Sequence, residues 1–115
     1  MMNINFQEFI SRNGISRTDA TGGEVALTKE HALRALELLK GTGTCVLGGD
    51  VYELESDGYF RPTYENWFFE KNNFNKKEQE EESLKLAHSF LSNYKEAQGK
   101  KIRYVLVTDM MIKNI

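Results

Sequence analysis

Two runs of β-favouring residues, separated by a single turn signal, constrain this chain more than any other feature. The first run, TCVLGGDVYEL, is followed by ESDG, and YFRPTYENWFFE then provides a return strand dense in aromatic residues. Gly58 suits the positive φ that a turn of this kind needs, and aromatic residues favour strands. We therefore predict a β-hairpin, with Pro62 on an edge strand or at a bulge because proline has no N–H to donate.

The paired glycines inside the first strand admit two interpretations. Gly48 and Gly49 weaken a strand, so such a pair usually marks a bulge or a close backbone approach, and here it would re-aim Asp50 and Tyr52. Together with Asp50, the triplet also resembles the turn that names the diguanylate cyclases, where glycines approach a nucleotide and a carboxylate helps to hold metal. That match ends after three residues, and such catalytic domains are considerably longer than 115 residues.

Three stretches with helical spacing surround the hairpin. FQEFISRNG predicts a short helix that stops at Gly14, and Thr28 caps a second helix that closes at Lys40 and Gly41. EQEEESLKLAHSFLSNYKEAQ predicts the longest helix, whose glutamates 78–82 complement the positive end and form solvated surface. KIRYVLVTD predicts a last strand, which could pair with the first hairpin strand and cover its edge.

These elements define the expected fold class. The order α-α-β-β-α-β, with ISRTDATGGEVAL as a loop, predicts an α+β fold in which helices cover one face of a small antiparallel or mixed sheet of about three strands. A chain of 115 residues can bury a core without metal or disulfide support, so we expect one domain over residues 1–115.

The charge of the chain is nearly balanced overall but concentrated locally. The formal net charge of −2 gives no indication of binding to nucleic acid or to an anionic membrane. Residues 50–70, however, carry six acidic side chains against the single Arg61, which makes this stretch an acidic island.

Few residues indicate catalysis or metal binding. His31 and His88 lie on different predicted helices, and Cys45 is the only cysteine, so we expect no metal and no cofactor. We expect Cys45 to be buried and His88 to be partly buried and hydrogen-bonded, although a nucleophilic Cys–His pair stays open at this point. A single cysteine, an N-terminus without a signal-peptide pattern and the absence of a long apolar run favour a cytoplasmic protein.

The hairpin favours a protein-binding surface over an active site. Alternation of Tyr52 and Leu54 with Glu53 and Glu55 places carboxylates on one exposed strand face beside aromatic rings, which are common anchors of interfaces. The predicted partner-binding residues are Asp50, Tyr52, Glu53, Glu55, Asp57, Tyr64 and Glu65. We expect Gly48, Gly49, Asn66 and Trp67 to shape the hairpin instead, with Trp67 buried.

The order of several motifs resembles a known family. The segment EVALTKEHALRALELLKGTGTCVLGGDVYELESDG and the later YENWFFE are similar to the bacterial immunity protein family numbered forty in polymorphic toxin systems. The matching elements are Ala26 to Thr28, the helix to Lys40, the strand Leu47 to Val51 and the strand Tyr64 to Trp67, within residues 24–70. The chain departs from the pattern at Val25, where the family is expected to have tryptophan.

The resemblance implies a function of a particular kind. It implies a non-enzymatic antidote that binds the toxic C-terminal domain of a cognate secreted protein in the cytoplasm and neutralises it. If that domain is a nuclease, its basic substrate groove would attract the hairpin carboxylates. The alternative function is a small-ligand-binding or enzymatic domain built on the turn at Gly48, Gly49 and Asp50.

Overall fold

The computed structural model describes residues 5–16, 24–71 and 75–109, which form three helices and five strands. In chain order the elements are α1 (Phe6–Asn13), β1 (Ile15–Ser16), β2 (Val25–Leu27), α2 (Lys29–Leu39), β3 (Val46–Leu54), β4 (Phe60–Phe68), α3 (Lys76–Asn93) and β5 (Ile102–Thr108). The predicted α+β class is confirmed.

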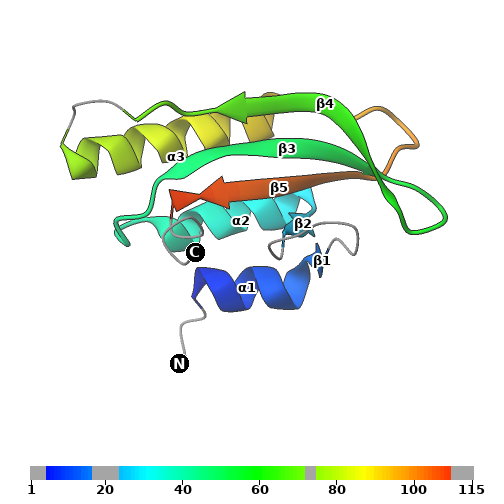
Figure 1. Cartoon of the computed structure of the whole chain (residues 1–115), viewed down its shortest axis with the longest axis horizontal. Helices are drawn as coiled ribbons and strands as arrows, with labels where there is room; N and C mark the ends of the chain where they lie inside the picture. The colour runs from blue at the N-terminus through cyan, green and yellow to red at the C-terminus, as the bar shows by residue number, and fades with distance from the viewer. Residues whose placement is uncertain (1–4, 17–23, 72–74, 110–115) are drawn as a thin grey trace.

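All pairings in the sheet are antiparallel, and the strand order is β1-β2-β5-β3-β4. The predicted pairing of the last strand with the first hairpin strand is confirmed, because β5 lies beside β3. β4 forms one edge of the sheet, as Figure 1 shows, so the edge position expected for Pro62 is also confirmed. The hairpin turn closes with Glu55 donating to the Tyr59 carbonyl at 2.8 Å, and Gly58 has the expected positive φ of 90°.

The helices cover one face of the sheet. In Figure 1, α2 and α3 lie behind the long strands, and α1 packs beside α2. Strand side chains point alternately to the two faces of the sheet. The core is therefore formed by the side chains on the helix-facing side of the strands and by the apolar stripes of the helices that pack against them. The buried residues of the main core are Phe6, Ile10, Leu27, Ala32, Ala35, Leu36, Leu39, Val46, Val51, Trp67, Leu84, Ala87, Leu91, Ile102, Tyr104 and Leu106.

The sheet has two more strands than the sequence predicted. β1 and β2 come from the stretch interpreted as a loop, of which residues 17–23 lie outside the described residues. β2 is only three residues long and pairs with β5 through Ala26 and Leu27, so its strand conformation depends on a partner about 80 positions away. No local pattern carries that information, and the predicted order α-α-β-β-α-β is therefore incomplete.

The longest helix also differs from its predicted extent. α3 begins at Lys76 rather than Glu78, because the Asn75 side chain caps it by accepting a hydrogen bond from the Glu78 N–H at 2.9 Å. The helix ends at Asn93, several residues before the predicted end. The cap of α2 is as predicted, with Thr28 Oγ accepting from the His31 N–H at 3.2 Å.

Candidate functional site

The paired glycines of β3 make room for the indole of Trp67. A Cβ atom on Gly49 would collide with the Trp67 ring, and one on Gly48 would collide with the Trp67 carbonyl oxygen. Trp67 is buried as predicted, with 8% of its surface exposed, and it stacks on Phe90 of α3 with ring centroids 4.6 Å apart. The space that a ligand would need on the α3 side of these two strand residues is thus already filled by the protein's own side chain.

A bulge interrupts β4 at residues 63–65, before the paired residues Asn66 and Trp67. Asp50 pairs with Asn66 and Tyr52 pairs with Pro62, so Val51 alone lies opposite the three residues 63–65. Thr63 closes the bulge by donating from its hydroxyl to the Val51 carbonyl at 2.8 Å. Tyr64 lies at the centre of the bulge with a φ of 68° and 86% of its surface exposed, which confirms its expected place on the surface.

Between this bulge and the hairpin turn, the acidic side chains are paired within the protein. Arg61 donates to the Glu53 carboxylate at 2.6 Å and lies 2.9 Å from the Glu55 carboxylate. Lys100 adds a second ion pair to Glu53 at 3.3 Å. The hydrogen bond from Arg61, together with that from Lys100, lowers the pKa of Glu53. The side chain of Glu53 is only 14% exposed, so the freely exposed carboxylate face expected here is wrong for this residue.

The other predicted partner-binding residues lie in different surroundings. Tyr52 packs edge-to-face on Phe60, and Asp57 accepts from the Tyr59 N–H inside the turn. Glu65 is exposed and accepts from the Tyr94 hydroxyl at 3.2 Å. Burial, followed by this hydrogen bond, raises the pKa of Tyr94, which keeps its hydroxyl protonated as the donor.

Asp50 differs from the paired carboxylates nearer the turn. It is half-buried on the face of the sheet opposite to Val51 and Trp67, and its carboxylate forms no hydrogen bond or ion pair with any described residue. The structure thus divides the seven predicted residues between two parts of the hairpin, one near the turn and one around the bulge.

Sequence reasoning did not single out the other features beside the bulge. Phe68 is 71% exposed, and alternation from the buried Trp67 is the signal that could have placed it outside the core. A shallow hollow of about 530 Å³ lies between Glu65 and the C-terminal half of α3, where Leu86, Phe90 and Tyr94 line it. Its α3 residues are spaced as one helix face, but only the fold brings them to Glu65.

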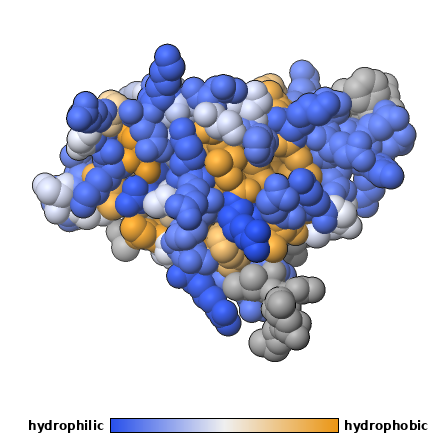
Figure 2. All heavy atoms as spheres, turned by 180° about the vertical axis from the view of Figure 1, so that it is seen from behind, coloured by the Kyte–Doolittle hydropathy of each residue, from blue (hydrophilic) through white to orange (hydrophobic). Residues whose placement is uncertain are grey.

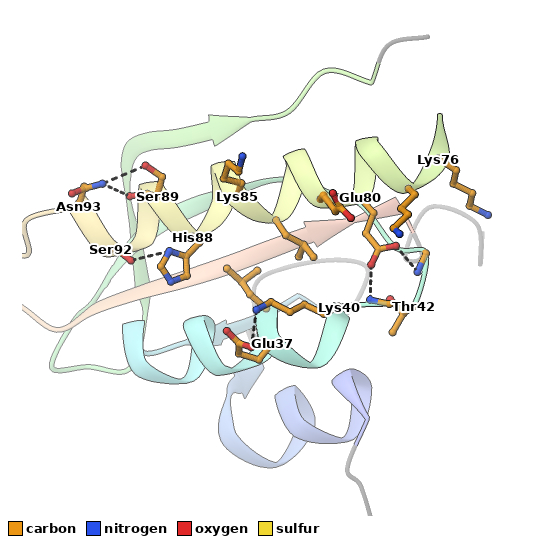
Figure 3. Close-up of a pocket in the computed structure, with 16 residues that line it drawn as sticks. Glu37, Lys40, Thr42, Lys76, Glu80, Lys85, His88, Ser89, Ser92 and Asn93 are labelled. Carbon is orange, nitrogen blue, oxygen red and sulfur yellow. Dashed lines mark hydrogen bonds and ion pairs between the residues drawn. The ribbon is translucent and has the colours of Figure 1, made fainter. Parts of the chain in front are cut away.

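A larger groove of about 1120 Å³ runs between α2 and α3 on the helical face. Figure 2 shows apolar atoms in a hollow on this face, bordered by hydrophilic side chains, and Leu36 and Leu84 are the apolar residues that line the groove. Many polar side chains around it interact with one another or with the backbone, as Figure 3 shows for Lys40 with Glu37 and for Asn93 with Ser89. Residues 48–50, which lie within strand β3 and not in a turn, do not line this groove.

Two residues at this groove differ from expectation. Glu80 is buried rather than solvated, because its carboxylate accepts from the Gly41 N–H at 2.7 Å and the Gly43 N–H at 2.9 Å and so holds the loop after α2 (Figure 3). His88 is exposed rather than partly buried, and its ring lies 3.4 Å from the Ser92 hydroxyl.

Other chemical sites find little support in the described ranges. No group of three or more histidine, cysteine, aspartate or glutamate side chains there could hold a metal ion. Cys45 is buried as expected, and its burial raises the pKa of the thiol, which disfavours the thiolate that a nucleophile needs. None of the helices in residues 5–16, 24–71 and 75–109 is long and apolar enough to cross a bilayer.

Fold and surface together define a small α+β domain with an exposed aromatic and acidic sheet edge. A family model described as "Immunity protein 40" matches residues 10–108, and the chain therefore belongs to this immunity protein family. The match confirms the resemblance noted in residues 24–70 and extends it through α3 and β5. No curated protein and no solved structure matches the chain.

Proposed function

We propose that this protein is a non-enzymatic antidote that binds the toxin domain of a cognate secreted bacterial protein and neutralises it in the cytoplasm. The observation that carries the proposal is membership of the Immunity protein 40 family over residues 10–108, because an immunity protein acts on a toxin by contact. Such a protein would take part in competition between bacteria, protecting the cell that makes it or its siblings.

The hairpin is the surface we propose for this contact. Exposed tyrosines supply large, rigid contact area at low entropic cost, and carboxylates raise the rate of association with a basic partner. Asp50, Tyr64 and Glu65 around the bulge keep their side chains available. Glu53 and Glu55, whose charges are shared with Arg61 and Lys100, would instead hold the hairpin in shape. If the toxin domain is a nuclease, its basic groove complements the remaining carboxylates.

Co-expression tests the proposal directly. The partner to use is the C-terminal domain of the secreted protein encoded beside this gene, expressed in bacteria with and without the immunity protein. We expect growth arrest by the toxin domain alone, rescue by the pair, and co-purification of a one-to-one complex. A catalytically silent form of the same domain should co-purify as well, which would show that rescue comes from binding.

Failure of rescue and of co-purification, with a toxin domain shown to be active on its own, would contradict the proposal. Chemical inactivation of the toxin without a stable complex would contradict the proposal that the antidote is non-enzymatic. The two results are distinguishable, because the second leaves rescue intact.

A further inference from the structure

The backbone of Tyr64 is in a conformation that its side chain does not favour. A φ of 68° is rare for a bulky residue, and strain of this kind persists where the surroundings or a function demand it. The ring, 86% exposed, contributes little to the core in return. Glycine or asparagine would occupy this position at lower cost, so folding alone does not explain a tyrosine here.

The bulge holds Tyr64 in a fixed setting. Thr63 Oγ donates to the Val51 carbonyl and accepts from the Glu65 N–H at 3.2 Å. The Glu65 carboxylate accepts from the hydroxyl of Tyr94, which ties the bulge to the end of α3. A ring presented on an ordered backbone loses little further entropy on binding, which is the property of a preorganised anchor.

The surroundings of Tyr64 indicate what kind of partner fits. The carboxylates of Asp50, on the neighbouring strand β3, and of Glu65 form no ion pair with any described residue, so their negative charge is not offset within the part of the chain that the structure describes. Beside Glu65 lies the hollow that Leu86 and Phe90 line, and Leu86 is 39% exposed. Negative charge disfavours an anionic partner, and a projecting ring beside a shallow hollow fits a protein surface better than a small molecule.

The same edge discourages pairing with another strand. Pro62 has no N–H to offer, and the bulge at residues 63–65 breaks the regular row of backbone groups along β4. A partner would therefore contact side chains here rather than extend the sheet, which argues against a second copy of this chain adding its own β4.

We propose that Tyr64 is the anchor residue of toxin binding, and that its ring enters an apolar pocket on the toxin domain. An arginine or lysine beside that pocket pairs with Asp50 or Glu65. This inference rests on the proposed function and specifies the contact: the bulge of β4 with the adjoining hollow of α3, rather than the hairpin turn or the groove between α2 and α3.

Affinity measurements with three variants test the anchor. The probe is the catalytically silent C-terminal domain of the neighbouring secreted protein, titrated with wild-type protein, Tyr64→Ala, Tyr64→Asn and Tyr59→Ala. Tyr59 is the matched control, because it is 63% exposed and lies at the hairpin turn. We expect both Tyr64 variants to weaken binding by at least about 30-fold, which is typical of an interface hot spot, and Tyr59→Ala to change it less than about threefold.

The asparagine variant separates binding from folding. Asparagine tolerates positive φ, so Tyr64→Asn should melt at the wild-type temperature or above it while its affinity falls. Wild-type affinity in both Tyr64 variants would overturn the anchor and leave the proposed function standing. An equal loss of affinity in Tyr59→Ala would contradict the assignment of the anchor to Tyr64 and would indicate a contact at the hairpin turn. Absence of binding by the wild-type protein would overturn the proposed function and this inference together.

Discussion

The two parts of the β3–β4 hairpin are built from similar residues but leave very different surfaces. Near the turn, Glu53 and Glu55 are paired with Arg61, and Lys100 completes the cluster. Around the bulge, the Asp50 carboxylate has no hydrogen-bond or ion-pair partner among the described residues, and Tyr64 is 86% exposed. The first part satisfies its polar groups internally, whereas the second leaves charge and ring surface open to a partner.

The local charge of a sequence is therefore not the charge that a partner meets. Residues 50–70 carry six carboxylates against one arginine, yet this arginine and a lysine from outside the stretch pair with two of them in one cluster. The strand register and contacts from other parts of the chain determine which carboxylates remain available to a partner.

Removing the indole of Trp67 should destabilise the hairpin more than any other change considered. Trp67→Ala deletes a buried ring stacked on Phe90 and should lower the free energy of unfolding by about 3–5 kcal/mol. Gly49→Ala, which pushes a methyl group into the same ring, should cost about 1–3 kcal/mol. Denaturant unfolding measures both changes.

Gly58→Ala is the control for these variants at the turn. It strains a φ of 90° but meets no atom within 4 Å, so its cost should stay at about 1–2 kcal/mol and toxin affinity should be unchanged. If Gly49→Ala were no more disruptive than Gly58→Ala, the close contact between Gly49 and Trp67 would not be what the paired glycines serve.

Matched charge neutralisation should separate the two parts of the hairpin by function. Glu53→Gln with Glu55→Gln and Asp50→Asn with Glu65→Gln each remove two negative charges. The first pair should lower the melting temperature by a few degrees with little effect on toxin dissociation, since its charges are engaged within the protein. The second should leave the melting temperature nearly unchanged and speed dissociation by about tenfold, as measured by surface-based kinetics.

Because both double variants change the net charge equally, their association rates at low salt should fall by similar factors. A faster dissociation in the Glu53 and Glu55 double variant alone would place the contact at the turn and reverse the assignment of the two parts.

The free energy of unfolding should depend weakly on pH through the ion pairs of Glu53. The folded pKa of Glu53 is lowered by Arg61 and Lys100, so its ion pairs contribute stability above the unfolded pKa of glutamate, about 4.3. That contribution is lost as the pH falls through the lower, folded pKa. The stability difference between wild type and Glu53→Gln should therefore shrink between pH 6 and pH 3, in unfolding curves recorded at each pH. A constant difference would mean that the pairs add nothing.

The features predicted correctly from sequence are those with local signals. The hairpin, its turn at Gly58, the cap at Thr28 and the burial of Trp67 each depend on residues close to one another in the chain. The short strand β2 and the buried Glu80 were missed, because the groups that stabilise them lie on β5 and in the loop at residues 41–43.

The candidate site likewise contains some contacts that the sequence could predict and others that it could not. Arg61 lies directly across the hairpin from Glu53, so this pairing follows from the turn position and was within reach of the sequence. The contact of Lys100 with Glu53 could not be predicted in this way, because the two residues are 47 positions apart. The positive φ of Tyr64 was likewise hidden, because the extra residues of the bulge appear only once both strands are in register.

Amide hydrogen exchange in the free protein and in its complex with the catalytically silent toxin domain would locate the contact surface. We expect binding to slow exchange most at residues 63–68 of β4 and in the adjoining end of α3, with little change at residues 53–61 near the turn. Protection concentrated at residues 53–61 or along the groove between α2 and α3, with none at residues 63–68, would contradict it.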